Sequence, residues 1–219
     1  MSLKLSIIGI VSIVILCGVM QISAERTFTL EVDDQVIVKL DARDRKVGIK
    51  NEGELVGAGT IVSIGKLAWG LVSNGQEINS NTSWTGAVPS EMTDWRNMTG
   101  WRANLSPTYK MKWTNHLWTL SEFKFQFSWN WNGSYEGIGQ YIALATVVDL
   151  DVYAAPTEKL DAGVVVSPPL NIGTSDNPIA QIQLKVTTTS HGDFEKSSAV
   201  CLVAIGGDGS FAKITCDMN

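Results

Sequence analysis

Large aromatic and polar side chains alternate strictly between Phe123 and Asn132. Successive side chains of a β-strand point to opposite faces of a sheet, so this two-residue period predicts a strand with one aromatic face and one polar face. Such an aromatic row is stable only against a hydrophobic core. We therefore predict a strand over residues 123–132 with five core side chains, namely Phe123, Phe125, Phe127, Trp129 and Trp131.

Short apolar or alternating runs recur along the rest of the chain, separated by Gly, Asn, Asp and Pro. None shows the sustained 3.6-residue period of an amphipathic helix, so helices are expected to be few and short. The predicted strands cover residues 27–32, 35–40, 46–50, 56–64, 123–132, 141–148, 163–166 and 179–188, followed by a hairpin between residues 201 and 216. About ten short strands predict an all-β fold, an antiparallel β-sandwich or jelly-roll-like domain.

Three local features of this pattern bear on the strand assignment. Asn132-Gly133 is a turn signal and is expected to end the aromatic strand. Residues 79–116 are polar, irregular and rich in tryptophan, and they predict either one long loop region or several short strands. The run 141–148 is almost continuously apolar, which is typical of a strand in the centre of a sheet.

The N-terminus has the pattern of a secretory signal peptide. Lys4 precedes an apolar stretch over residues 5–20, and a small residue, Ala24, stands before the charged pair Glu25-Arg26. We predict cleavage after Ala24, which leaves one domain over residues 25–219 in a secreted protein. The alternative is an uncleaved membrane anchor, because 16 apolar residues is close to the roughly 17 needed to span a bilayer. No later segment is apolar enough to cross a membrane.

Two of the three cysteines, Cys201 and Cys216, lie outside the predicted signal peptide. An even pair in a secreted chain predicts one disulfide. The sequence between them is two β-rich runs around Gly-Gly-Asp-Gly-Ser, which predicts a hairpin. If Gly207 to Ser210 form a four-residue loop, the two cysteines lie directly opposite each other. The predicted bridge is structural, because the spacing is not that of a redox motif.

The chain is acidic, with 22 acidic and 17 basic residues. This balance argues against a nucleic-acid partner and against a general polybasic membrane surface. An extracellular glycan or protein is the expected class of partner. The sequence does not predict the oligomeric state.

Catalytic signals are weak, so the sequence favours a protein that is not an enzyme. His191 lies in Ser-His-Gly-Asp, where Asp193 could orient it, but no Gly-x-Ser-x-Gly nucleophile motif is present. A solvated loop is the more ordinary setting for such a histidine, and the same holds for the pair Asp149 and Asp151. No cofactor or metal is expected, and calcium is the alternative, because these two aspartates and Asp208 offer oxygen ligands. A secreted hydrolase remains the third functional alternative.

All eight tryptophans fall between Trp69 and Trp131, and two of them form a repeated Trp-Arg pair. Indole rings with interleaved cations suit sugar stacking and anionic groups. The predicted contact surface lies within residues 84–118 and comprises Trp84, Trp95, Arg96, Trp101, Arg102, Lys110, Lys112 and Trp113. The alternative is that these tryptophans fill one end of the sandwich, with the arginine side chains lying over them. Trp69 and Trp118 are assigned to the core beside the aromatic strand.

The same stretch holds four sequons for N-glycosylation, at Asn81, Asn97, Asn104 and Asn132. An occupied sequon must face solvent, so glycans would place these segments on the surface and would hinder their insertion into a bilayer. Pro107 directly follows the Asn104 sequon and lowers the expected occupancy there.

Three functions follow in order of support. The first is a secreted, glycosylated binding or structural protein that uses the Trp/Arg segment. The second is a membrane-active, pore-forming protein, in which the Ser/Thr-rich stretch 181–190 could become a barrel strand. The third is the secreted hydrolase.

Overall fold

The computed structural model describes residues 26–33, 60–74, 77–81, 83–92, 94–115, 117–192 and 195–218. For residues 77–81 it describes the backbone alone. The predicted signal peptide and the strands predicted for residues 35–40 and 46–50 lie outside the described residues. The described part of the chain consists almost entirely of antiparallel β-strands.

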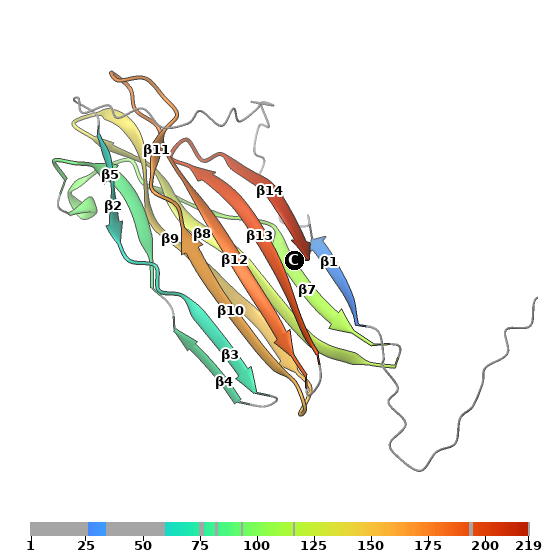
Figure 1. Cartoon of the computed structure of the whole chain (residues 1–219). Helices are drawn as coiled ribbons and strands as arrows, with labels where there is room; N and C mark the ends of the chain where they lie inside the picture. Colours follow the sequence, from blue (N-terminus) through green and yellow to red (C-terminus); the bar gives the residue numbers. More distant parts are fainter. Residues whose placement is uncertain are drawn as a thin grey trace, which may run out of the picture.

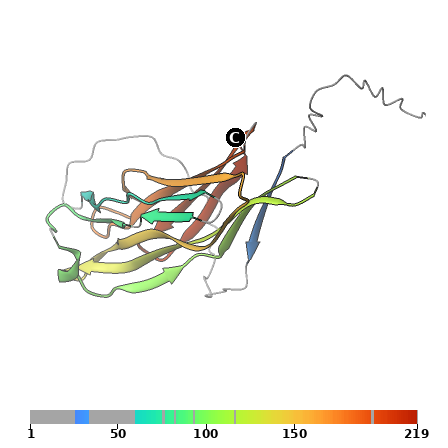
Figure 2. The ribbon, with the colours of Figure 1, turned by 90° about the horizontal axis from the view of Figure 1, so that it is seen from below.

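Two seven-stranded sheets pack face to face, which confirms the predicted β-sandwich (Figures 1 and 2). The first sheet has the order β1 (Thr27–Asp33), β7 (Thr108–Thr114), β8 (Thr119–Tyr135), β9 (Ile138–Ala154), β5 (Thr85–Pro89) and β2 (Ile61–Gly65), and β6 (Arg102–Leu105) also pairs with β8. The second sheet has the order β14 (Phe211–Met218), β13 (Lys196–Gly206), β12 (Ala180–His191), β10 (Lys159–Val166), β3 (Gly70–Asn74) and β4 (Glu77–Asn81), and β11 (Leu170–Asn171) pairs with β12.

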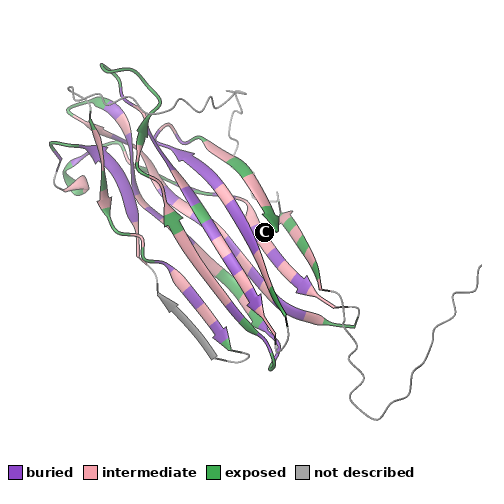
Figure 3. Cartoon of the chain, viewed as in Figure 1, coloured by how far each residue is buried: buried purple, intermediate pink, exposed green. Residues whose placement is uncertain are grey.

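The aromatic face of β8 is the centre of the core. Phe123, Phe125, Phe127 and Trp129 are fully buried, whereas Trp131, nearer the end of the strand, is partly buried. The opposite sheet supplies aliphatic side chains with the same alternation, among them Leu184, Val186, Val203 and Ile205. Figure 3 shows buried positions alternating with less buried ones along β12, whereas β13 is buried at most of its positions. The sequence prediction for this face is therefore confirmed, with Trp131 at its margin.

The predicted turn at Asn132-Gly133 is wrong. β8 continues to Tyr135, and the chain reverses at Glu136 and Gly137. Asn132 has a positive φ of 62° at an irregularity in the pairing of β8 with β9, where its side chain donates a hydrogen bond to the Gly100 carbonyl. Asparagine tolerates this left-handed conformation within a strand irregularity as well as in a turn, so the residue type alone did not separate the two settings.

The irregular segment 79–116 forms several short strands, as in the second of the two interpretations of this region. β6 and β7 run along the same edge of β8 and are separated by Ser106 and Pro107. Proline lacks an N–H donor, so the ladder is interrupted at this point. Ser106 compensates: its backbone N–H donates to the Phe127 carbonyl, and its Oγ accepts the Phe127 N–H at 2.9 Å.

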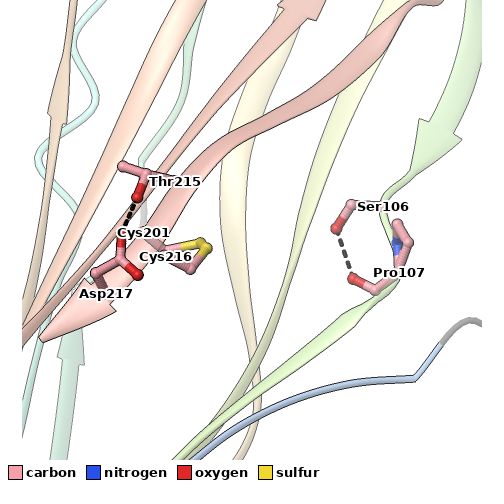
Figure 4. Close-up of a disulfide and its surroundings, with 6 residues drawn as sticks. All are labelled: Ser106, Pro107, Cys201, Thr215, Cys216 and Asp217. Atoms are coloured by element: carbon pink, nitrogen blue, oxygen red, sulfur yellow. Dashed lines mark hydrogen bonds between the residues drawn. A yellow bond between two sulfur atoms is a disulfide. The ribbon is translucent and has the colours of Figure 1, made fainter.

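A second Ser-Pro step repeats this arrangement in the other sheet. Ser167 and Pro168 separate β10 from β11 along one edge of β12. The Ser167 N–H donates to the Gln183 carbonyl, and Ser167 Oγ accepts the Gln183 N–H at 2.9 Å. In both steps the serine hydroxyl donates to the carbonyl of its own proline, as Figure 4 shows for the first. The same Ser-Pro dipeptide thus separates two strands that pair along one edge of β8 in the first sheet and along one edge of β12 in the second.

The predicted disulfide hairpin is confirmed. Cys201 of β13 and Cys216 of β14 are opposite each other in the register and are joined by a disulfide (Figure 4). The turn is one residue longer than expected, because Ile205 pairs with Phe211. A register shift between Leu202 and Val203 absorbs the extra residue and restores the cysteine pairing.

Candidate functional site

The Trp-Arg cluster, which we define as Trp84, Trp95, Arg96, Trp101, Arg102 and Trp131, lies at one end of the sandwich, at the left in Figure 1. A 3₁₀-helix, η1 (Trp95–Asn97), carries the first Trp-Arg pair. Asp94 caps this helix by accepting the Arg96 backbone N–H at 3.0 Å. The cap helps so short a helix to form, because the N–H of its second residue has a partner.

The Arg96 guanidinium binds both carboxylate oxygens of Asp94, with distances of 2.8 Å from Nε to Oδ1 and 2.8 Å from Nη2 to Oδ2. These hydrogen bonds hold the pKa of Asp94 below its ordinary value and raise the pKa of Arg96. The Arg96 side chain is 75% exposed, so this cation is oriented by its neighbour but remains open to solvent.

Three indole rings of the cluster meet edge to face. Trp95 lies between Trp84, at 6.3 Å and 75°, and Trp101, at 5.8 Å and 86°. Trp101 Nε1 donates to the Trp95 carbonyl at 3.2 Å. All three side chains are partly exposed, so they are neither fully buried nor a flat open platform. Their perpendicular rings form a corner, with one ring face set against the edge of the next.

Glycines allow the rings of the cluster to pack against the backbone. Trp84 lies against Gly65, Trp101 against Gly133, and Trp131 against Gly209 in the turn between β13 and β14. The Arg102 guanidinium covers Trp131 at 5.3 Å from the ring centre, a cation–π contact. Arg102 and Trp131 face each other in the pairing of β6 with β8, so the sheet register fixes this contact.

Three of the predicted contact residues belong elsewhere. Lys110 and Lys112 lie on β7, and Lys110 Nζ binds Glu31 Oε2 at 2.6 Å. This hydrogen bond raises the pKa of Lys110 and lowers that of Glu31. Trp113 is fully buried and packs against Phe28 at 5.3 Å, so its assignment to the contact surface is wrong. The signal that was missed is the alternation of Tyr109, Met111 and Trp113 with lysines, the same two-residue period as in β8.

The prediction for Trp118 is wrong in the opposite direction, because this side chain is exposed rather than buried. It was assigned to the core, but it is 57% exposed in the turn between β7 and β8. Leu117 beside it is 77% exposed. Asn115 organises this turn by accepting the N–H groups of both residues on its Oδ1 at 2.9 Å. Trp118 therefore lies beyond the end of the core, whereas Trp69 is buried against Phe123 as predicted.

The predicted glycosylation sites differ in exposure. Asn97 is exposed on η1, and Asn132 is partly buried with its amide bonded to Gly100 and Gln140. Asn104 is only 6% exposed and accepts the Leu105 N–H on its Oδ1, so its burial, like Pro107, disfavours a glycan there. The side chain of Asn81 lies outside the described residues.

The residues considered for catalysis make ordinary structural contacts. His191 Nε2 lies 3.2 Å from Asp161 Oδ2, while Asp193 and His116 lie outside the described residues. Asp151 binds Lys124 at 2.8 Å and raises its pKa, and a register irregularity separates it from Asp149. Asp208 accepts the Ser210 N–H within its turn. Among the described residues, no group of three or more His, Cys, Asp or Glu side chains could hold a metal ion.

A buried ion pair at the other end of the sandwich was not predicted. Arg26 Nη2 binds Glu158 Oε1 at 3.0 Å, and each side chain is at most 7% exposed. Ser190 Oγ contacts both partners at 3.3 Å, and Ser121 donates to Ser190 at 2.8 Å. Glu195 is the exposed second partner of Arg26. Because Arg26 and Glu158 are far apart in the chain, no local sequence pattern predicts that they form an ion pair.

A shallow cleft of about 460 Å³ lies between the β2 edge and the end of β10. Its lining is mainly aliphatic, with Val164, Val165 and Val166 from β10 and Lys66 from the β2–β3 connection. None of the predicted contact residues lines it. In the part of the chain that the structure describes, no helix is long and apolar enough to cross a bilayer.

Comparisons with protein family models, with curated proteins and with solved structures give no match for this chain. Any functional proposal for this chain therefore depends on its residues and their geometry.

Proposed function

We propose that this chain is a secreted glycan-binding protein whose contact site is the Trp-Arg cluster. The observation that carries the proposal is the corner of three partly exposed indole rings beside the exposed guanidinium of Arg96. Indole faces stack on the apolar faces of sugar rings, and a guanidinium binds acidic sugar substituents with paired hydrogen bonds. The signal-peptide pattern and the disulfide support secretion.

The arrangement favours binding over membrane permeation. The Ser/Thr-rich stretch considered as a barrel strand is β12, an inner strand of the second sheet. It pairs with β10 along one edge and with β13 along the other. Its release would break both ladders and expose buried side chains such as Leu184 and Val186.

Within the cluster, the residues have different roles. Trp84, Trp101 and Trp131 each pack against a glycine, and they position the site. Among the described residues, the Arg96 side chain donates its hydrogen bonds to Asp94, and it is 75% exposed to solvent. Arg96 is thus the residue with which to test binding without disturbing the packing.

A glycan array that includes heparin, followed by calorimetry with any glycan that binds, tests the proposal. We expect Arg96→Ala to weaken binding about tenfold, the loss of a charge-assisted hydrogen bond, with little change in the free energy of unfolding because its ion pair with Asp94 is exposed. Lys213→Ala, an exposed lysine on β14, is the matched control and should bind normally. Absence of any glycan ligand, or equal binding by both variants, would refute the glycan assignment.

A further inference from the structure

The turn between β7 and β8 presents two apolar side chains to solvent, at the end of the sandwich opposite the Trp-Arg cluster (Figures 1 and 2). Leu117 and Trp118 are adjacent, and Trp118 is the most exposed of the eight tryptophans. Exposing a leucine and a tryptophan side by side contributes nothing to the packing of the fold. Adjacent exposed apolar groups of this kind mark sites of association.

Three backbone donors in the described part of this turn are satisfied within the turn itself. The Asn115 N–H donates to the Trp118 carbonyl at 3.1 Å. The N–H groups of Leu117 and Trp118 both donate to Asn115 Oδ1 at 2.9 Å. A turn closed in this way can leave water without stranding these donors, and an unsatisfied backbone group is the main cost of entering a lipid phase.

The absence of charged residues in this turn indicates the kind of surface that it could contact. The sequence from Trp113 to Ser121 contains no Asp, Glu, Lys or Arg. A neutral apolar tip matches a zwitterionic lipid surface, and tryptophan favours the boundary between headgroups and acyl chains. The sequons at Asn97 and Asn132 lie at the opposite end of β8, so glycans there would not obstruct this tip.

We propose that Leu117 and Trp118 form a shallow anchor that inserts into the interface of a zwitterionic lipid bilayer. The sandwich then stands with β8 directed away from the membrane and presents the Trp-Arg cluster to the surroundings. Two inserted side chains give the protein only weak, reversible binding to the bilayer, as other single membrane anchors do. The anchor does not depend on glycan binding, because the two sites use different residues at different ends.

Cosedimentation of the mature chain with phosphatidylcholine vesicles tests the anchor. We expect the wild type to bind, and Leu117→Ser/Trp118→Ser to lower the partition coefficient about tenfold or more. The matched control is Leu170→Ser/Ile172→Ser, which removes two other exposed apolar side chains near β11 and should bind like the wild type. Circular dichroism and urea unfolding of each variant establish that it is folded.

Two further readouts distinguish a neutral anchor from other modes of attachment. Binding should persist when salt is raised, and entrapped dye should stay inside the vesicles. The anchor is overturned by absence of wild-type binding, by equal binding of the tip variant, by loss of binding at high salt, or by dye release. The tip variant should retain any glycan binding, so failure of the anchor and failure of the glycan assignment give separate results.

Discussion

The six-membered ring of Trp101 occupies the space that a Cβ atom on Gly133 would need. Gly133→Ala is therefore expected to displace the ring and to weaken its hydrogen bond to the Trp95 carbonyl. We expect the free energy of unfolding, measured in urea, to fall by about 1–3 kcal/mol, the usual cost of overpacking. Gly163→Ala in β10 is the control, because a Cβ there meets nothing within 4 Å and should leave stability equal or slightly higher.

Trp113 and Trp118 should respond to truncation in opposite ways. Trp113→Ala removes a fully buried ring and should lower the free energy of unfolding by about 3–5 kcal/mol. Trp118→Ala removes an exposed ring and should change it by less than about 0.5 kcal/mol. Urea unfolding of both variants makes the comparison, and equal losses would contradict the different burial of the two rings.

The two Ser-Pro steps offer a matched pair of variants. Ser106→Ala leaves the buried N–H of Phe127 without its acceptor and should cost about 1–3 kcal/mol of stability. Ser167→Ala removes the same bond to Gln183, which is only partly buried, so water can replace the hydroxyl and the cost should be smaller. Thermal and urea unfolding measure both, and the reverse order would show that burial does not control the effect.

The buried pair Arg26–Glu158 predicts strong coupling between distant parts of the chain. Arg26→Met leaves the Glu158 carboxylate buried without its cation and should lower stability by about 3–5 kcal/mol. Arg26→Met/Glu158→Leu removes both charges and should recover most of that loss. A double-mutant cycle in urea measures the interaction, and additive losses would show that the two side chains do not interact energetically.

The cap of η1 should depend on pH. Hydrogen bonds from Arg96 hold the pKa of Asp94 below its ordinary value. These hydrogen bonds therefore stabilise the turn fully at pH values above the ordinary aspartate pKa, and their contribution is lost as the pH falls through the lowered pKa of Asp94. The Arg96 amide resonance should follow this acid titration by NMR. Asp94→Asn should abolish the titration at that amide, and an Arg96 amide that stays constant in acid would contradict the cap.

The parts of the fold that were predicted correctly carry a local, periodic signal. The alternation from Phe123 to Trp129 can place its aromatic side chains on one face only if it is a strand, and Cys201 and Cys216 flank a single turn. Both inferences depend on short stretches of sequence. They did not require the strand order, which follows from contacts among distant segments.

The tryptophans were harder to assign because residue type does not determine burial. Trp113 follows the alternation of β7 into the core, whereas Trp118 lies in the turn between β7 and β8, just before the first residue of β8. The alternation along β8 does not extend into the turn, and the sequence does not show at which residue the strand begins. The buried Arg26–Glu158 pair was missed for a different reason, since it joins the residue before β1 to the turn before β10, two segments far apart in the sequence.

The length of β8 has a mechanical consequence. This one strand of 17 residues, about 55 Å at the usual rise per residue, connects the Leu117–Trp118 turn to the Trp-Arg cluster. Its ladder hydrogen bonds to β7 and β9 run across the strand, so tension between the two ends loads many of them in shear at the same time. A molecule held at both ends would therefore transmit force through its most extensively paired strand rather than peel open from an edge.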